Sequence, residues 1–177
     1  AFGKWKFVGF DNYIKMFQDD SFWTITKNTL LFMIYTVPVT VIIGLLIAVL
    51  LNQKIKGKTA FRAIYFLPMV VAPAAVAMVW KWLFNTDYGI INIVLGALHL
   101  PADTNWIANP KTALLACAIV TIWSSVGYDA ILLLSGLQSI SGSYYEAARI
   151  DGASSFQQFK SITVPLVSPT LFFVLMM

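Results

Sequence analysis

Apolar residues gather along the chain into three long runs with polar segments between them. The runs cover residues 29–51, 63–84 and 112–136, and a fourth run occupies 162–177. A helix of about 20 apolar residues crosses the roughly 30 Å hydrocarbon layer of a bilayer. The pattern therefore predicts an all-α membrane protein, a polytopic transmembrane helix bundle with three full spans and the start of a fourth.

The fourth run is too short to cross a bilayer by itself. From Pro165 onward it would form about 20 Å of helix, at about 1.5 Å per residue. The chain begins with Ala1 and not with an initiator methionine, and no cleavable signal pattern opens it. We therefore expect residues 1–177 to be a single transmembrane domain that is truncated at both ends.

Prolines inside the apolar runs predict close packing among the spans. Pro38 lies in the first run, and Pro68 and Pro73 lie in the second. Each proline kinks a helix and frees a backbone carbonyl, which neighbouring helices or water must satisfy within a bilayer. These prolines favour a packed bundle over independent membrane anchors.

The composition agrees with a bilayer environment. Hydrophobic residues make up 59% of the chain and charged residues 11%, and the mean hydropathy is +0.76. An average soluble domain carries about 25% charged residues. Cys117 and His99 are single residues of their kinds, so the sequence offers no internal disulfide and no set of metal ligands. We expect no metal site.

Positive charge collects in one loop and orients the predicted spans. Segment 52–62 carries cations without an acid, at Lys54, Lys56, Lys58 and Arg62, whereas loop 85–111 carries Asp87 and Asp103 against one lysine. Cytoplasmic loops of membrane proteins are enriched in lysine and arginine. We therefore predict that 52–62 and 137–161 face the cytoplasm and that 1–28 is an external segment. The net charge of +4 follows this orientation, so we expect a lipid bilayer as partner and no nucleic acid.

Aromatic and apolar residues mark the outer end of the second run. Trp80, Trp82 and Phe84 fall at that end and predict an aromatic belt at the membrane–water interface. Residues 89–101 have the pattern of a short helix lying on the membrane surface. Both features place the loop after the second run beside the outer leaflet.

The polar segment 137–161 has the pattern of two short helices joined by a turn. Ser143 and Glu146 have the spacing of a capping box at a helix start. Gly152 suits the left-handed position just past a helix end. Ser154 and Ser155 are each followed three residues later by glutamine, so either can begin the second helix.

One face of this segment has features of a docking surface. Ala147 and Ala148 keep the first helix shallow enough for a partner to approach, and Phe156 and Phe159 fall near one face of the second helix as apolar anchors. The alternative is an ordinary loop between spans, with Glu146 as a helix cap and both phenylalanines on the membrane. The local pattern leaves both interpretations open.

The stretch EAARIDGASSFQQFKSITVPLVSP, residues 146–169, closely resembles the EAA loop of ABC importer permeases. The matching residues are Glu146, Ala147, Ala148, Asp151, Gly152, Ala153, Ile162 and Pro165. Residues 66–92, FLPMVVAPAAVAMVWKWLFNTDYGIIN, resemble the carbohydrate-uptake branch of these permeases, the maltose, glycerol-phosphate and multiple-sugar type. The resemblance covers nearly the whole chain.

This resemblance implies a fold, a function and partners. The family's common core has six spans, of which this chain would hold the second to the fourth and part of the fifth. The implied function is that of a permease subunit in an ATP-driven, binding-protein-dependent importer of a sugar or sugar-like solute, in a bacterial-type plasma (inner) membrane. The implied partners are a homologous second permease subunit, a cytoplasmic ATPase dimer and an extracytoplasmic solute-binding protein. The ATPase-coupling loop, 137–161, would act through Glu146, Ala147, Ala148, Asp151, Gly152 and Ala153, with Phe156 and Phe159 added from helical spacing.

We expect ATP hydrolysis in a partner and not in this chain. The sequence contains no G-x-x-x-x-G-K-[ST] phosphate loop, so the chain itself would bind no cofactor, and ATP and Mg would be bound by the ATPase. The spans contain no cluster of nucleophile and base, which argues against an enzyme. One alternative is a secondary transporter or channel subunit, which would transport without an ATPase partner. Another is a non-transporting membrane scaffold or enzyme anchor.

Polar residues inside the third run predict a substrate path. Asp129 is the one carboxylate inside a predicted span, and a charge there is costly unless it is paired or faces a watery cavity. Ser125 lies one turn earlier, and Trp123 lies near mid-depth, where an indole can stack on the apolar face of a sugar. The alternative is a buried set of hydrogen bonds between helices. The residues leave the identity of the solute open.

Overall fold

The computed structural model describes residues 7–53 and 57–177, in which the regular secondary structure is helical. The elements are α1 Asp11–Gln18, α2 Asp20–Asn52, α3 Lys58–Val70, α4 Pro73–Leu83, α5 Ile90–Ala97, α6 Ala113–Gln138, α7 Gly142–Ile150, α8 Ser155–Gln158, the π-helix η1 Phe159–Thr163 and α9 Val164–Met176. Lys54 and Lys56, which carry part of the charge argument, lie outside the described residues. The predicted all-α fold is confirmed.

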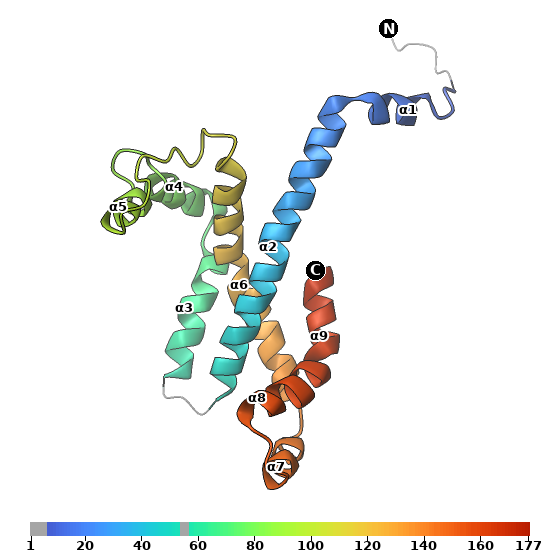
Figure 1. Ribbon diagram of the computed structural model, residues 1–177, viewed down its shortest axis with the longest axis vertical. Coiled ribbons are helices and arrows are strands. Elements are labelled where there is room, and N and C mark those ends of the chain that lie inside the picture. Colours follow the sequence, from blue (N-terminus) through green and yellow to red (C-terminus); the bar gives the residue numbers. More distant parts are fainter. Residues whose placement is uncertain (1–6, 54–56) are drawn as a thin grey trace.

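Three helices are long and apolar enough to cross a membrane. They are α2, α6 and the continuous helix Ser155–Met176, which joins α8, η1 and α9. Figure 1 shows α2 and α6 crossing each other, with α3 and α9 beside them. Their contacts agree, because α6 packs against α2, α3 and α9. The predicted spans 29–51 and 112–136 correspond to α2 and α6.

The core lies where α2, α6 and α9 meet. It consists of Val41, Ile47, Ala48 and Leu51 from α2, Ala130, Leu133, Leu134 and Leu137 from α6, and Val167 and Val174 from α9. These positions recur at the three- and four-residue spacing of one helix face. The opposite faces of the same helices keep large apolar side chains exposed, among them Ile42, Leu46, Ile131 and Phe172. A contiguous apolar exterior of this kind suits lipid or further protein subunits.

The straight span expected over 63–84 is two helices in the structure. The axes of Ala63–Val70 and Pro73–Leu83 differ by 106°. Val71 and Ala72 between them have extended backbone conformations. The proline ring of Pro73 disfavours the helical conformation in the residue before it, so the chain leaves the helix at this point and restarts with proline in the first turn.

The boundary expected between the coupling loop and the fourth run, near Ile162, is absent. The helix instead begins at Ser155 and continues for 22 residues to Met176. Its π-helical part, Phe159–Thr163, lies at the expected boundary, and Pro165 follows in the first turn of α9. The second short helix and the following span are therefore one element, which is long enough to cross a bilayer.

Two glycines let helices approach α6 closely. A β-carbon at Gly127 would overlap the backbone carbonyl oxygen of Tyr65 in α3. A β-carbon at Gly136 would lie 2.9 Å from the β-carbon of Thr170 in α9, which is closer than real side chains come. Small residues at helix contacts are a common means of association in membranes, because they allow more van der Waals contact.

A buried asparagine organises the loops around α5. Asn92 is 4% exposed. Its Nδ2 donates to the carbonyl oxygens of Thr86 (3.2 Å) and Thr104 (3.0 Å), and its Oδ1 accepts a hydrogen bond from Trp106 Nε1 (2.8 Å). A buried amide with three partners ties the loop before α5 to the loop after it. The short helix expected within 89–101 is present as α5.

The aromatic residues at the end of α4 differ from the expected belt. Trp80 packs against Phe84 and against Trp123 of α6, with ring centroids 5.2 and 5.6 Å apart. Phe84 is buried and also contacts Trp106, at 5.5 Å between centroids. Of the three residues assigned to the belt, only Trp82 is exposed. The other two join α4 to α6 and to the loop after α5.

Candidate functional site

The first helix of the polar segment begins two residues earlier than expected. α7 starts at Gly142, and Ser141 is its N-cap, with Ser141 Oγ accepting a hydrogen bond from the backbone N–H of Ser143 (3.4 Å). The capping box expected between Ser143 and Glu146 is therefore wrong. Because Ser143 is already inside the helix, Glu146 is free of a capping role and lines a groove instead.

The turn after α7 has the geometry expected for Gly152. Its φ is 76°, in the left-handed region. The backbone N–H of Gly152 donates to the carbonyl of Arg149 (3.1 Å), and that of Ala153 donates to the carbonyl of Ala148 (2.8 Å). This pair of hydrogen bonds is the Schellman motif, in which glycine at the left-handed position closes the helix end. The predicted role of Gly152 in the backbone is confirmed.

The second helix begins with a complete capping box. The backbone N–H of Ser154 donates to Gln157 Oε1 (2.7 Å), and the backbone N–H of Gln157 donates to Ser154 Oγ (3.3 Å). Gln158 Nε2 also donates to the carbonyl of Ala153 (2.9 Å). Of the two serines that the sequence allowed, Ser154 is the cap. The turn is therefore fixed by hydrogen bonds on both sides.

The exposed surface of this segment differs from the predicted one. Phe156 is 72% exposed, whereas Phe159 is half-buried and lines the groove, so the two rings do not share one docking face. Ala147 is exposed, and Ala148 is half-buried. The sequence interpretation missed Ile150, which is 87% exposed at the end of α7. The sequence alone could have indicated Ile150, because it is an apolar residue within an otherwise polar stretch.

A groove separates α7 from α8 and from the end of α2. Its volume is about 880 Å³. Polar side chains supply much of its lining, including Asn52, Gln53, Glu146, Arg149 and Gln158. Among the predicted coupling residues, Glu146 and Phe159 line this groove. Asp151, Gly152 and Ala153 lie at the turn beyond it.

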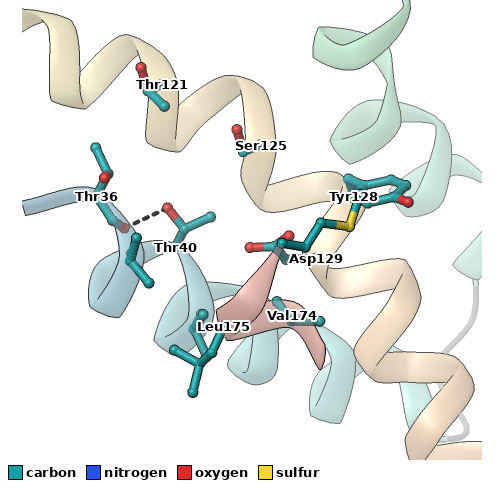
Figure 2. A pocket seen from close by; sticks show the side chains of 11 residues that line it. Thr36, Thr40, Thr121, Ser125, Tyr128, Asp129, Val174 and Leu175 are labelled. Carbon is teal, nitrogen blue, oxygen red and sulfur yellow. Dashed lines mark hydrogen bonds between the residues drawn. The ribbon is translucent and has the colours of Figure 1, made fainter. Parts of the chain in front are cut away.

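A second hollow lies between α2, α6 and α9, within the spans. Its volume is about 320 Å³, and Figure 2 shows the polar side chains from α2 and α6 that surround it. The polar lining residues are Thr36, Thr40, Thr121, Ser125, Tyr128 and Asp129, and the apolar ones include Val174 and Leu175. Among the described residues that line it, none is a cation. The cavity therefore places one carboxylate among hydroxyl groups.

The structure brings two of the three predicted path residues together. Ser125 and Asp129 both line the cavity, whereas Trp123 does not and packs against Trp80. The reason is helical phase. Ser125 and Asp129 are four residues apart, or about 400° around the helix, so they lie on nearly the same face. Trp123 and Asp129 are six residues apart, or about 600°, so their directions differ by about 120°.

The hydroxyl groups from α2 were missed by the sequence interpretation. Thr40 Oγ1 donates to the carbonyl of Thr36 (2.7 Å), and Thr36 Oγ1 donates to that of Phe32 (2.8 Å). With their hydrogens used in this way, both hydroxyl oxygens keep lone pairs for the cavity. The four-residue spacing of these threonines within an apolar run was the available signal.

The described residues offer no cluster of three or more histidine, cysteine or acidic side chains that could hold a metal ion. Both sites can therefore bind a ligand through hydrogen bonds and charge. The inner cavity contributes the carboxylate of Asp129, and the groove beside α7 is lined by Glu146 and Arg149.

These features define the class of the protein, a polytopic helical membrane protein with a polar helix–turn–helix between two spans. The family described as "Binding-protein-dependent transport system inner membrane component" matches residues 28–177. The chain belongs to this family.

Several relatives and solved structures are similar over most of the chain. It is 39% identical to the trehalose/maltose transport system permease protein MalF of Thermococcus litoralis, covering 97% of this chain and 58% of that one. It is 33% identical to the sn-glycerol-3-phosphate transport system permease protein UgpA of Yersinia pestis, covering 96% and 57%. A crystal structure of a bacterial alginate ABC transporter, in complex with an alginate pentasaccharide-bound periplasmic protein, matches 93% of this chain and 57% of its counterpart. Its TM-score is 0.82 at 26% identity. The chain thus spans less than two thirds of the length of these relatives.

Proposed function

We propose that this chain forms part of the permease subunit of an ATP-driven, binding-protein-dependent importer, and that α7, the Gly152 turn and α8 couple it to ATPase subunits. The observation that carries the proposal is the hydrogen-bonded turn between two short helices with exposed apolar side chains. Ile150 and Phe156, on either side of the turn, have the exposure that a partner protein would cover. A turn held by a Schellman motif and a capping box moves as a unit under load.

The position of this segment supports a cytoplasmic placement. In Figure 1, α7 and α8 lie at the same end of the molecule as the end of α2 and the start of α3, and α1 and α5 lie toward the other end. Positions 58 and 62, which carry two of the cations of segment 52–62, belong to the first half of α3. The protein would lie in the plasma (inner) membrane of a bacterial-type cell. Under the positive-inside rule this end would face the cytoplasm.

The proposed assembly contains further subunits. A homologous second permease subunit would cover exposed apolar faces of the spans, a cytoplasmic ATPase dimer would bind ATP and Mg, and an extracytoplasmic solute-binding protein would deliver the solute. When the ATPases close on ATP, the docked helices would move with them, and the spans would shift between inward- and outward-open states. This chain itself would hydrolyse no ATP.

A sugar or sugar-like solute fits the inner cavity best. Thr36, Thr40, Ser125 and Tyr128 supply hydroxyl groups, and Asp129 supplies a carboxylate that accepts hydrogen bonds from sugar hydroxyls. The related proteins carry trehalose/maltose, sulfoquinovosyl glycerol and sn-glycerol-3-phosphate in their names. These solutes share several hydroxyl groups.

We expect ATP-dependent uptake from the full-length protein with its co-purifying subunits in liposomes. The assay supplies the solute-binding protein outside, ATP inside and a panel of sugars. The expected result is uptake of at least one sugar that requires both ATP and the binding protein. Uptake driven by an ion gradient without any ATPase subunit would instead identify a secondary transporter.

Replacing Asp129 by asparagine is expected to lower the transport rate about tenfold, because a carboxylate makes stronger hydrogen bonds than an amide. The amount of ATPase that co-purifies should stay unchanged. The matched control is Asp87→Asn, which makes the same chemical change at an exposed loop position. A loss of assembly in Asp129→Asn would show that the carboxylate holds helices together and does not serve the path.

A further inference from the structure

One side-chain hydrogen bond joins α7 directly to the helix that follows it. Tyr145 Oη and Thr163 Oγ1 are 3.0 Å apart, across 18 residues of sequence. Thr163 is 7% exposed, and Tyr145 is half-buried. Both residues also line the groove between the two helices. A partly buried bond of this kind is shielded from exchange with water, so its loss is felt more than that of a surface bond.

The bond ends at an irregular point of the helix Ser155–Met176. Thr163 is the last residue of η1, the π-helical part between α8 and α9. Its Oγ1 also donates to the carbonyl of Gln158 (3.5 Å), at the start of the same part. π-Helical segments inside α-helices often occur at functional sites, because the backbone ladder is interrupted there. The hydrogen bond therefore holds α7 to the irregular part of this helix, at the junction of η1 and α9.

The other connections of α7 do not transmit movement to α9 directly. Its start is joined to α6 by a link at 139–141, and its end is joined to α8 through the Gly152 turn. The Gly152 turn, closed by hydrogen bonds on both sides, passes a displacement of α7 to Ser155 at the start of α8. The irregular part η1 then lies between α8 and α9. The Tyr145–Thr163 bond bypasses the turn.

We propose that the Tyr145–Thr163 hydrogen bond is a positioning contact that makes α9 follow the movement of α7. The inference rests on the proposed coupling role of this segment, and it adds a residue pair that acts between docking and the spans. Tyr145 does not belong to the exposed docking surface, because its hydroxyl points inward to Thr163. Its contribution is to the ratio of solute transported to ATP hydrolysed and not to ATPase binding.

The test uses the full-length protein in its complex with the ATPase and solute-binding protein, in liposomes. Tyr145→Phe and Thr163→Val each remove the bond with little change in shape. Each is expected to lower the solute transported per ATP about three- to tenfold, which corresponds to the loss of one hydrogen bond. The double variant should be no lower than Thr163→Val alone, because that variant already removes the bond to Tyr145 as well as the one to the carbonyl of Gln158.

Two controls separate coupling from general damage. Thr163→Ser keeps the hydroxyl group and should retain the parental ratio. Tyr88→Phe makes the same change as Tyr145→Phe at an exposed position outside the segment, and should also be neutral. The amount of co-purified ATPase is measured for every variant and should match the parent.

Three outcomes would overturn the inference. They are an unchanged ratio in Tyr145→Phe, additive losses in the double variant, and loss of the ATPase from the complex, which would mean that the bond shapes the docking surface. A parental complex without ATP-dependent uptake would overturn the proposed function itself, and this inference with it. The parental assay therefore distinguishes the two failures.

Discussion

Replacing Gly127 by valine is expected to lower the free energy of unfolding by about 3 kcal/mol or more, as severe overpacking does. Gly127 is buried on α6, where a β-carbon would overlap the carbonyl oxygen of Tyr65 and lie 2.7 Å from its carbonyl carbon. Both atoms belong to the backbone of α3, so no flexible side chain can move aside. The helix α3 would have to separate from α6, and Tyr65 would lose its packing against the core.

A matched pair of alanine variants isolates this effect. Gly127→Ala and Gly142→Ala add the same methyl group within a helix, but the methyl group at Gly142 meets no atom within 4 Å. We expect Gly127→Ala to destabilise the protein, and Gly142→Ala to be neutral or more stable by up to about 1 kcal/mol. The measurement is the unfolding temperature of the full-length protein in detergent. Equal unfolding temperatures for the two variants would contradict the close contact between α3 and α6.

Gly152→Val is expected to lower ATP-driven uptake about tenfold or more. The left-handed conformation costs an ordinary residue roughly 1–2 kcal/mol and a β-branched residue more, and each 1.4 kcal/mol is about a tenfold change in an equilibrium. Gly152 has a φ of 76° and open space around its α-carbon. The expected loss therefore comes from the backbone of the turn and not from a clash with neighbours.

Asparagine at the same position is the matched control, since it tolerates the left-handed region far better than valine. Gly152→Asn should keep most of the uptake and of the co-purified ATPase, while Gly152→Val loses both. The assay is uptake in liposomes together with quantification of the ATPase in the purified complex. Equal losses in the two variants would mean that the turn needs glycine for close approach of a partner and not for its φ angle.

The spans were predictable because hydropathy is a local property. Apart from Leu137, the core residues of α2 and α6 lie within 29–51 and 112–136, the ranges that the apolar runs predicted. The break at Val71 and Ala72 was harder to predict. Pro73 signalled a disturbance, but a proline in a membrane helix produces anything from a kink to a turn, and the 106° bend depends on how α4 packs against α6.

The candidate sites also combine features that the local sequence predicted with features that it did not. The left-handed turn at Gly152 follows from local backbone chemistry and was predicted, and the capping box was predicted at Ser154 or Ser155. The start of α7 was misplaced because Ser141 and Ser143 carry the same capping side chain, and the structure uses Ser141. Trp123 was assigned to the path by its depth along α6, although helical phase directs it to Trp80.

The sequence by itself determined that the chain is a helical membrane protein, where its apolar helices lie, and where the polar segment turns. These properties depend on interactions among residues a few positions apart. Tertiary structure alone decided which polar side chains share the inner cavity and that Tyr145 reaches Thr163. Those contacts join helices that are distant in sequence, and their register is set by steric fit at points such as Gly127 and Gly136, which no local pattern encodes.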